Sequence, residues 1–102
     1  MSLTKAKLIT IITERILRSE IIAMLKEKGA TGYTQTDAKG EGSRGIRASD
    51  WEGHNVKIQA IVSEAVATTI MESIAETYFE NYAVIVFLGD VEVMRGDKYI
   101  PD

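Results

Sequence analysis

The sequence predicts an α+β fold in which the elements follow the order β-α-β-β-α-β. Four short runs are β-branched, threonine-rich or alternately apolar, as strands are, and two longer segments repeat their apolar residues at helical spacing. A chain of 102 residues is long enough for one domain and too short for two. We therefore expect residues 1–102 to form a single domain.

The first half of the chain supplies a strand, a helix and a second strand. Residues 8–12 (LITII) are apolar, mostly β-branched and bounded by polar residues, which is typical of a strand. From about residue 14 to residue 28 the apolar side chains have a helical period, with Thr13 as the expected N-cap and Gly29 as the expected stop. Residues 31–36 are rich in threonine and include a tyrosine, which favours a second strand.

The second half repeats the pattern in the order strand, helix, strand. Every second residue from 56 to 62 is apolar, which predicts a strand, and Ser63 follows as the expected N-cap of a helix. An apolar stripe at i, i+4 spacing then runs to Tyr78 and predicts that helix. Residues 83–88 (AVIVFL) form a nearly continuous apolar run, typical of a central strand, with Val91 and Val93 as candidates to extend it.

This order is the ferredoxin-like arrangement, a four-stranded antiparallel sheet with both helices on one face. The opposite face of such a sheet then needs a cover of another kind. Many unrelated functions use this fold, so the function has to be argued from other features of the chain.

Composition excludes several classes of function. The chain has no cysteine, which rules out disulfides, thiolate metal sites and cysteine nucleophiles. The only histidine, His54, has no acidic cluster at metal-ligand spacing, so we expect no metal site. A net charge of −3 opposes binding to nucleic acid. The N-terminus lacks an apolar stretch long enough for a signal peptide or a membrane span, so we expect a cytoplasmic protein.

The segment from residue 37 to residue 53 has no apolar period and carries four of the eight glycines. Loops of this length inside a compact domain are usually functional. Residues 40–45 (GEGSRG) match the pattern G-x-G-x-x-G, but no helical segment follows them, so we do not expect a Rossmann site. The glycines can still turn backbone N–H groups onto an anion while Arg44 and Arg47 hold phosphate oxygens. A glycine linker with two solvated arginines is the alternative interpretation.

Four segments of the chain together carry a resemblance to a known family. They are residues 8–17 (LITIITERIL), 29–34 (GATGYT), 40–47 (GEGSRGIR) and 78–83 (YFENYA). The most specific part is Gly-Tyr-Thr followed by Gly-Ser-Arg-x-x-Arg. With these segments the chain resembles the SbtB-type branch of the PII signalling proteins, over residues 8 to about 98.

The resemblance implies a homotrimer with nucleotide sites in the clefts between neighbouring subunits. The ligands in that branch are adenine nucleotides, namely cyclic AMP, AMP, ADP and ATP. A long T-loop, here at about residues 38–53, changes order with the ligand and reports to a partner, usually a membrane bicarbonate transporter. The resemblance thus implies a regulatory protein with no catalytic residues and no cofactor, cytoplasmic or held at the inner face of the membrane by its partner.

The family's functional residues carry over to three places in this sequence. In the loop, phosphate would be held by Gly42, Ser43, Arg44 and Arg47. The adenine and ribose would lie along Gly32, Tyr33 and Thr34. The family's B-loop position, where the second helix meets the last strand, corresponds to Tyr82, Ala83 and Val84. Trp51 is expected either to contact the partner or to pack back on its own subunit.

The sequence departs from the family pattern in several ways. Glu41 stands where several relatives carry lysine, which favours a monophosphate or cyclic nucleotide over ATP. Residues 48–54 look shorter than in some relatives, and the cysteine-bearing tail of some members is absent, so redox control by that tail is not expected. The motif Thr-Gly-x-x-Gly-Asp-Gly-Lys of the nitrogen-signalling members is also absent, which argues against 2-oxoglutarate binding.

Two functions of other classes remain as alternatives. A slow ATP or ADP hydrolase is one, because Glu41 or Asp50 could lie near a bound nucleotide, although no base, nucleophile and orienting group are recognisable together. An amino-acid-sensing ferredoxin-like domain is the other. Arg95, which follows the last predicted strand, is either a further phosphate contact or a solvated side chain.

Overall fold

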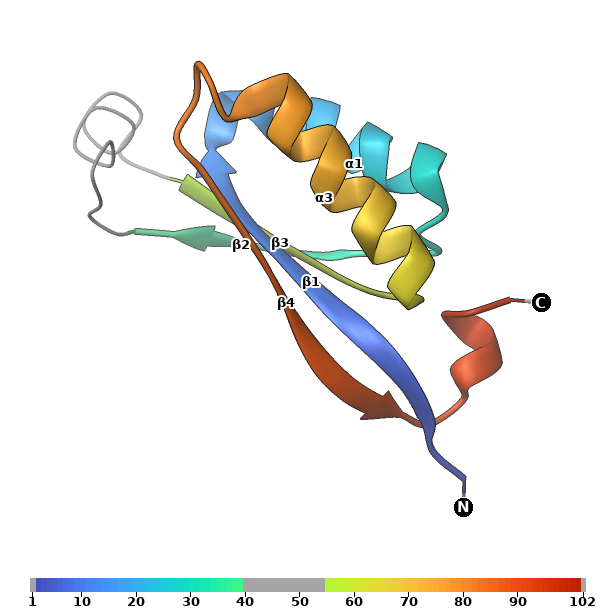
Figure 1. Ribbon diagram of the computed structural model, residues 1–102. Coiled ribbons are helices and arrows are strands. Elements are labelled where there is room, and N and C mark those ends of the chain that lie inside the picture. Colours follow the sequence, from blue (N-terminus) through green and yellow to red (C-terminus); the bar gives the residue numbers. More distant parts are fainter. Residues whose placement is uncertain (1, 40–54, 102) are drawn as a thin grey trace.

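The computed structural model describes residues 2–39 and 55–101 of the protein. Within this part the strands form one four-stranded antiparallel sheet in the order β2-β3-β1-β4, and both α-helices lie on one face of it (Figure 1). The predicted α+β, ferredoxin-like fold is therefore confirmed. The elements are β1 (Thr4–Glu14), the 3₁₀ turn η1 (Arg15–Leu17), α1 (Arg18–Lys28), β2 (Thr34–Ala38), β3 (Asn55–Val62), α3 (Glu64–Tyr78), β4 (Val84–Val93) and the 3₁₀ turn η2 (Gly96–Lys98).

The face of the sheet that the helices cover holds the hydrophobic core. Alternate residues of β1 and β3 point to this face and pack against α1 and α3, as the period of a strand requires. Burying these side chains removes apolar surface from water, at about 25 cal/mol for each Å². The side chains with no exposed surface include Ile9, Ile11, Val56, Ile58, Ile21, Ile70 and Ile74.

The other face of the sheet has no helix over it. In β4, the side chains of Val84, Val86 and Leu88 pack on the core, so the residues between them point to the uncovered face. Ile85 is 56% exposed there and Phe87 is 49% exposed. The sheet therefore presents large apolar side chains on both faces of β4.

Strand β4 corrects one prediction from the sequence. The continuous apolar run predicts a central strand, but β4 lies at the edge of the sheet, with β1 as its neighbour. The run is apolar on both faces because one face meets the core while the other carries the exposed pair Ile85 and Phe87. Within a single chain, β4 is therefore buried on one face only, and Ile85 and Phe87 could be buried only by another chain.

The helix ends confirm two of three predicted signals. Gly29 ends α1 in a left-handed conformation with φ of 118°, which glycine adopts without strain. Ser63 caps α3, since its Oγ accepts a hydrogen bond from the Val66 N–H at 3.2 Å. Thr13 does not cap α1. It lies in β1, and α1 begins only at Arg18, after η1.

Two strand boundaries also differ from the prediction. β1 runs from Thr4 to Glu14, well beyond residues 8–12, and β2 runs from Thr34 to Ala38 instead of 31–36. In β1 the polar end residues pair across the sheet with β4, which a search for apolar residues cannot detect. Over residues 2–39 and 55–101, no helix is long and apolar enough to cross a membrane.

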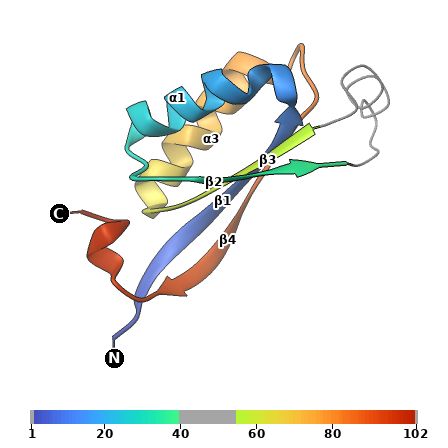
Figure 2. The same ribbon diagram turned by 180° about the vertical axis from the view of Figure 1, so that it is seen from behind.

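The register brings four strand ends together. Thr13 near the end of β1 pairs with Val56 at the start of β3 and with Val84 at the start of β4, and Asp37 near the end of β2 also pairs with Val56. We call this end of the sheet the loop end, because β2 leaves it and β3 enters it. Figures 1 and 2 show both chain termini near the opposite end.

Candidate functional site

The turn between α3 and β4 at the loop end is fixed by hydrogen bonds to the end of β1. The Ala83 N–H donates to Glu14 Oε2 at 2.8 Å, and Thr13 Oγ1 donates to the Ala83 carbonyl oxygen at 3.3 Å. On the helix side, the Tyr82 N–H donates to the Tyr78 carbonyl oxygen at 3.0 Å. Both backbone polar groups of Ala83 are thus paired within the protein. We call residues 79–83 the Ala83 turn.

Two tyrosines attach this turn to the helix layer. The rings of Tyr78 and Tyr82 meet edge to face, with their centroids 5.9 Å apart. The Tyr78 hydroxyl donates to Glu20 Oε1 at 3.0 Å, which joins α3 to α1. Burial raises the pKa of Tyr78 to about 12, and the hydrogen bond to Glu20 adds to the rise. Tyr82 itself is 36% exposed, so part of its ring can meet a ligand.

The other strand ends at the loop end are tied to the start of α1. Arg15 Nη2 lies 2.8 Å from Asp37 Oδ1, and Arg18 Nε donates to Gln35 Oε1 at 2.7 Å, so β2 is fastened at two places. Arg15 Nε and Asn55 Oδ1 are buried and have no hydrogen-bond partner among the described residues.

The segment Gly32, Tyr33 and Thr34 lies at the start of β2, away from the loop end. Tyr33 is 40% exposed, and Lys26 Nζ lies 5.7 Å from the centroid of its ring. Among the described residues, no atom beyond Gly32 and its two chain neighbours lies within 4 Å of the position that a Cβ on Gly32 would take. Thr34 pairs with Gln59, in the middle of β3.

The sequence-predicted contacts therefore fall on opposite edges of the sheet. Gly32 to Thr34 lead into one edge strand, β2, and Tyr82 to Val84 lead into the other, β4, with β3 and β1 between them. Three strand spacings of about 4.8 Å separate the edges by about 14 Å. Within one chain the two segments therefore lie across the width of the sheet from each other.

The remaining predicted residues lie outside the described part of the chain. They are Gly42, Ser43, Arg44, Arg47 and Trp51, together with Glu41, His54 and the rest of residues 40–54. Arg95 is described. It is exposed, lies beyond the far end of β4 and has a positive φ of 59°, so within one chain it is remote from the Ala83 turn.

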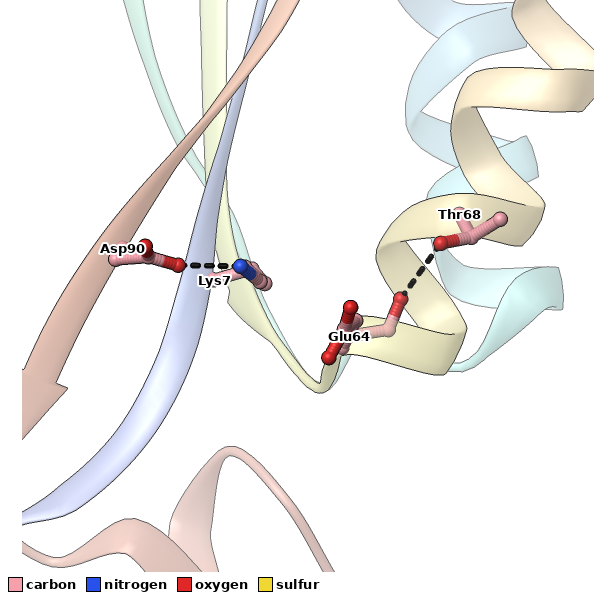
Figure 3. Close-up of polar contacts among 4 residues, drawn as sticks. All are labelled: Lys7, Glu64, Thr68 and Asp90. Atoms are coloured by element: carbon pink, nitrogen blue, oxygen red, sulfur yellow. Dashed lines mark hydrogen bonds and ion pairs between the residues drawn. The ribbon is translucent and has the colours of Figure 1, made fainter.

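A hollow of about 500 Å³ lies at the opposite end of the sheet from the Ala83 turn. Its floor carries a cross-strand ion pair between Lys7 on β1 and Asp90 on β4, shown in Figure 3 with Glu64 at the start of α3. The hydrogen bond from Lys7 lowers the pKa of Asp90, and the same bond raises the pKa of Lys7. The hollow is lined by Lys5, Ala6, Lys7, Glu64, Asp90, Val91 and Glu92.

Each lysine of this hollow lies opposite an acid across the strands, since Lys5 pairs in register with Glu92 as Lys7 does with Asp90. In the described part of the chain, no group of three or more His, Asp or Glu side chains could hold a metal ion. At the loop end, by contrast, the side chains of Thr13 and Glu14 bind the backbone of the Ala83 turn and not another side chain.

Comparison with known proteins identifies the family. The model of the nitrogen regulatory protein P-II family matches residues 6–98 of the chain. The chain belongs to the PII family. It is also similar to a protein of Thermus thermophilus described as PII-like and signalling, TTHA0516, with 49% identity and a TM-score of 0.85 over 97% of this chain and 99% of that one.

Two further structures carry ligands. CPII of Thiomonas intermedia K12, a PII-like nitrogen regulatory protein, has been solved bound to ADP, AMP and acetate, with 27% identity and a TM-score of 0.86 over 98% of this chain and 99% of CPII. A second CPII structure holds ADP, AMP and bicarbonate, with 26% identity and a TM-score of 0.84 over 97% of each chain. The resemblance to the PII superfamily is thus confirmed, while the names of these similar structures point to PII-like proteins in general and not specifically to the SbtB type.

Sequence reasoning missed the two side chains that hold the Ala83 turn. Thr13 and Glu14 look like a helix N-cap followed by a first-turn acid, and the local sequence pattern favours that interpretation. The partner of both is Ala83, 70 and 69 residues away along the chain.

Proposed function

We propose that this PII-like protein belongs to the SbtB-like branch and senses adenine nucleotides as a homotrimer. Each nucleotide would be held in a cleft between two subunits. The observation that carries the proposal is the division of the expected contacts between two opposite edges of one sheet. Tyr33 and its neighbours lead into the edge strand β2, and Tyr82 and its neighbours lead into the edge strand β4. A trimer lets the β2 edge of one subunit face the β4 edge of the next.

The uncovered face of the sheet supports the assembly. Ile85 and Phe87 are about half exposed in the single chain, on a strand whose sequence is apolar on both faces. Contiguous exposed apolar side chains of this size commonly mark contacts between proteins. Closed symmetry then buries the same patch in every copy.

The ligand class is supported by the related structures. CPII binds ADP and AMP, together with acetate or bicarbonate. In this chain we expect Gly32, Tyr33 and Thr34 to contact the adenine and ribose of AMP, ADP, ATP or cyclic AMP, with Tyr82, Ala83 and Val84 as the opposite wall. The phosphates would be held by Gly42, Ser43, Arg44 and Arg47.

We further propose that residues 38–53 act as the T-loop and pass the nucleotide signal to a partner, a membrane bicarbonate transporter, with Trp51 as a contact. The protein would then work in the cytoplasm, peripherally at the inner face of the membrane through that partner, as a regulator and not as an enzyme. Slow ATP or ADP hydrolysis and amino-acid sensing remain the alternatives. Release of inorganic phosphate, or a rise in melting temperature with free amino acids alone, would favour them.

Calorimetric titration tests the nucleotide site. Charge-assisted hydrogen bonds are worth about 1.5 to 3 kcal/mol each, so Arg44→Ala or Arg47→Ala should weaken the binding of AMP roughly ten- to hundredfold. Adenosine should be affected much less. The matched control is Lys98→Ala, which removes an exposed positive charge from η2, beyond the far end of β4.

Two results would contradict the proposal. Wild-type binding of AMP by both arginine variants, as folded trimers, would remove the phosphate contact. Light scattering that gives 11.3 kDa for the wild type, instead of three times that mass, would remove the intersubunit cleft.

A further inference from the structure

Glu14 places a negative charge at the wall of the proposed nucleotide site. Its Oε2 accepts the Ala83 N–H at 2.8 Å, so the carboxylate lies directly behind the Ala83 turn. Carboxylate acceptors form stronger and shorter hydrogen bonds than neutral acceptors do. The bond also occupies a backbone N–H that would otherwise be free to bind a phosphate oxygen.

Among residues 2–39 and 55–101, no ion pair joins that carboxylate to a cation. The adjacent Arg15 directs its guanidinium to Asp37 at 2.8 Å, which makes a pair with no net charge. The residue opposite Glu14 on β3 is the neutral Asn55. Lys57 lies two pairs further along β3, opposite Ile12, and in the described part of the chain no ion pair joins it to Glu14.

We infer that Glu14 is a specificity-determining residue of the nucleotide site, which selects against additional phosphate groups. This inference rests on the proposed function, because it assumes that the Ala83 turn forms one wall of the site. The carboxylate has two effects. Its hydrogen bond keeps the turn in a shape that fits an adenine nucleotide, and its charge disfavours each further negative charge on the ligand.

The size of the charge effect follows from Coulomb's law. Two unit charges about 8 Å apart in a partly solvated site interact by enough to change affinity roughly two- to threefold. ATP carries about two more negative charges than AMP, so the carboxylate should disfavour ATP relative to AMP by roughly fivefold. The neutral ligand adenosine should not respond to the charge.

The variant Glu14→Gln separates the two effects. The amide oxygen can still accept the Ala83 N–H, but the negative charge is gone. We expect the ratio of the ATP and AMP dissociation constants to fall roughly fivefold relative to wild type, with adenosine binding unchanged. The control Glu72→Gln removes an exposed carboxylate from the middle of α3 and should leave the ratio as it is.

A second variant tests the anchoring of the turn. Thr13→Val removes the hydroxyl that donates to the Ala83 carbonyl oxygen but keeps the charge of Glu14. We expect weaker binding of AMP, ATP and adenosine by a similar factor, because only the shape of the wall has changed. A structural effect of this kind raises the dissociation constants of all three ligands together and leaves the ratio of the ATP and AMP constants unchanged.

The measurement is calorimetry of all three ligands on the assembled protein at one fixed salt concentration. An unchanged ratio in Glu14→Gln, with wild-type affinity for AMP, would overturn the inference while leaving the proposed function in place. Failure of the wild type to bind any of the three ligands would instead overturn the proposed function, and the inference with it.

Discussion

Both faces of the sheet carry large apolar side chains, but only one face is covered by helices. On the covered face, Ile9 and Ile11 of β1 have no exposed surface, because α1 and α3 lie over them. On the uncovered face, Phe87 and Ile85 of β4 remain about half exposed. The single chain therefore covers the apolar residues of one face of its sheet and leaves large apolar side chains of β4 exposed on the other.

The polar residues of the sheet follow the same division. At the loop end, Thr13 and Glu14 bind the backbone of the Ala83 turn, so their polar groups are used to shape a wall. At the opposite end, Lys7 and Asp90 form an ion pair with each other. A side chain that holds a turn is expected to matter for ligand binding, whereas a pair of exposed charges is not.

The largest effect should come from a cavity in the covered face. Ile70 of α3 has no exposed surface, and Ile70→Ala should lower the free energy of unfolding by about 2 to 5 kcal/mol, because the core cannot close around the lost atoms. Denaturant titration gives the value. A loss of less than about 1 kcal/mol would mean that the helix layer packs more loosely than these contacts indicate.

The uncovered face offers the matching test with a different result. Phe87→Asp places a charge where we propose that subunits meet, which should cost about 2 kcal/mol or more of assembly free energy per copy. Light scattering should show a smaller species whose circular dichroism still indicates the same fold. Exposed Glu72→Gln on α3 is the control and should stay fully assembled. A trimer that persists in Phe87→Asp would show that the second core lies elsewhere.

The sequence predicted the order of elements well, because the apolar periods in this chain are local properties. The caps at Ser63 and Gly29 were also predicted, since a cap acts within a few residues of its own position. The error at Thr13 has the opposite cause. Threonine followed by an acid is equally compatible with a helix start and with a strand end that binds a distant backbone, and only the fold decides between them.

The candidate site was predictable only in part for a related reason. The segments at Tyr33 and Tyr82 were found through a family resemblance, but no sequence pattern shows that they lie on opposite edges of the sheet. That arrangement depends on the strand order, which is a property of the whole chain. Glu14 was missed as a site residue because its partner at Ala83 is reached only after the sheet has formed.

A smaller effect is expected at Tyr78, the polar side chain among the core residues. Tyr78→Phe removes the hydrogen bond to Glu20 at 3.0 Å and should cost about 1 kcal/mol near pH 7. The pKa of Tyr78 is raised to about 12 from an ordinary value of 10.0, so the folded state favours the protonated phenol. That contribution is fully present below pH 10 and is lost as the pH rises from 10 to 12.

The measurement is the free energy of unfolding at a series of alkaline pH values. The wild type should lose stability between pH 10 and pH 12, whereas Tyr78→Phe should lose less over the same range, since it has no phenol to ionise at this position. Tyr82→Phe, at the more exposed ring of the same pair, is the matched control. Equal losses of unfolding free energy in the wild type and in Tyr78→Phe would show that ionisation of Tyr78 does not cause the loss of stability above pH 10.

The smallest effect is expected at the far end of the sheet, where Asp90→Asn breaks the ion pair with Lys7. Asp90 is 85% exposed, and the attraction between exposed charges is weakened by water and salt, so the melting temperature should change by no more than about 2 °C. The lowered pKa of Asp90 means that any contribution is present above its ordinary pKa of 3.8 and disappears as the pH falls below it. Thermal melts at pH 7 and pH 3 measure both. The dissociation constant for AMP should not change, because the pair lies at the end of β1 and β4 away from the Ala83 turn. A tenfold change in that constant would instead place a ligand contact in the hollow beside Lys7. The distinction between the two ends of the sheet would then be lost.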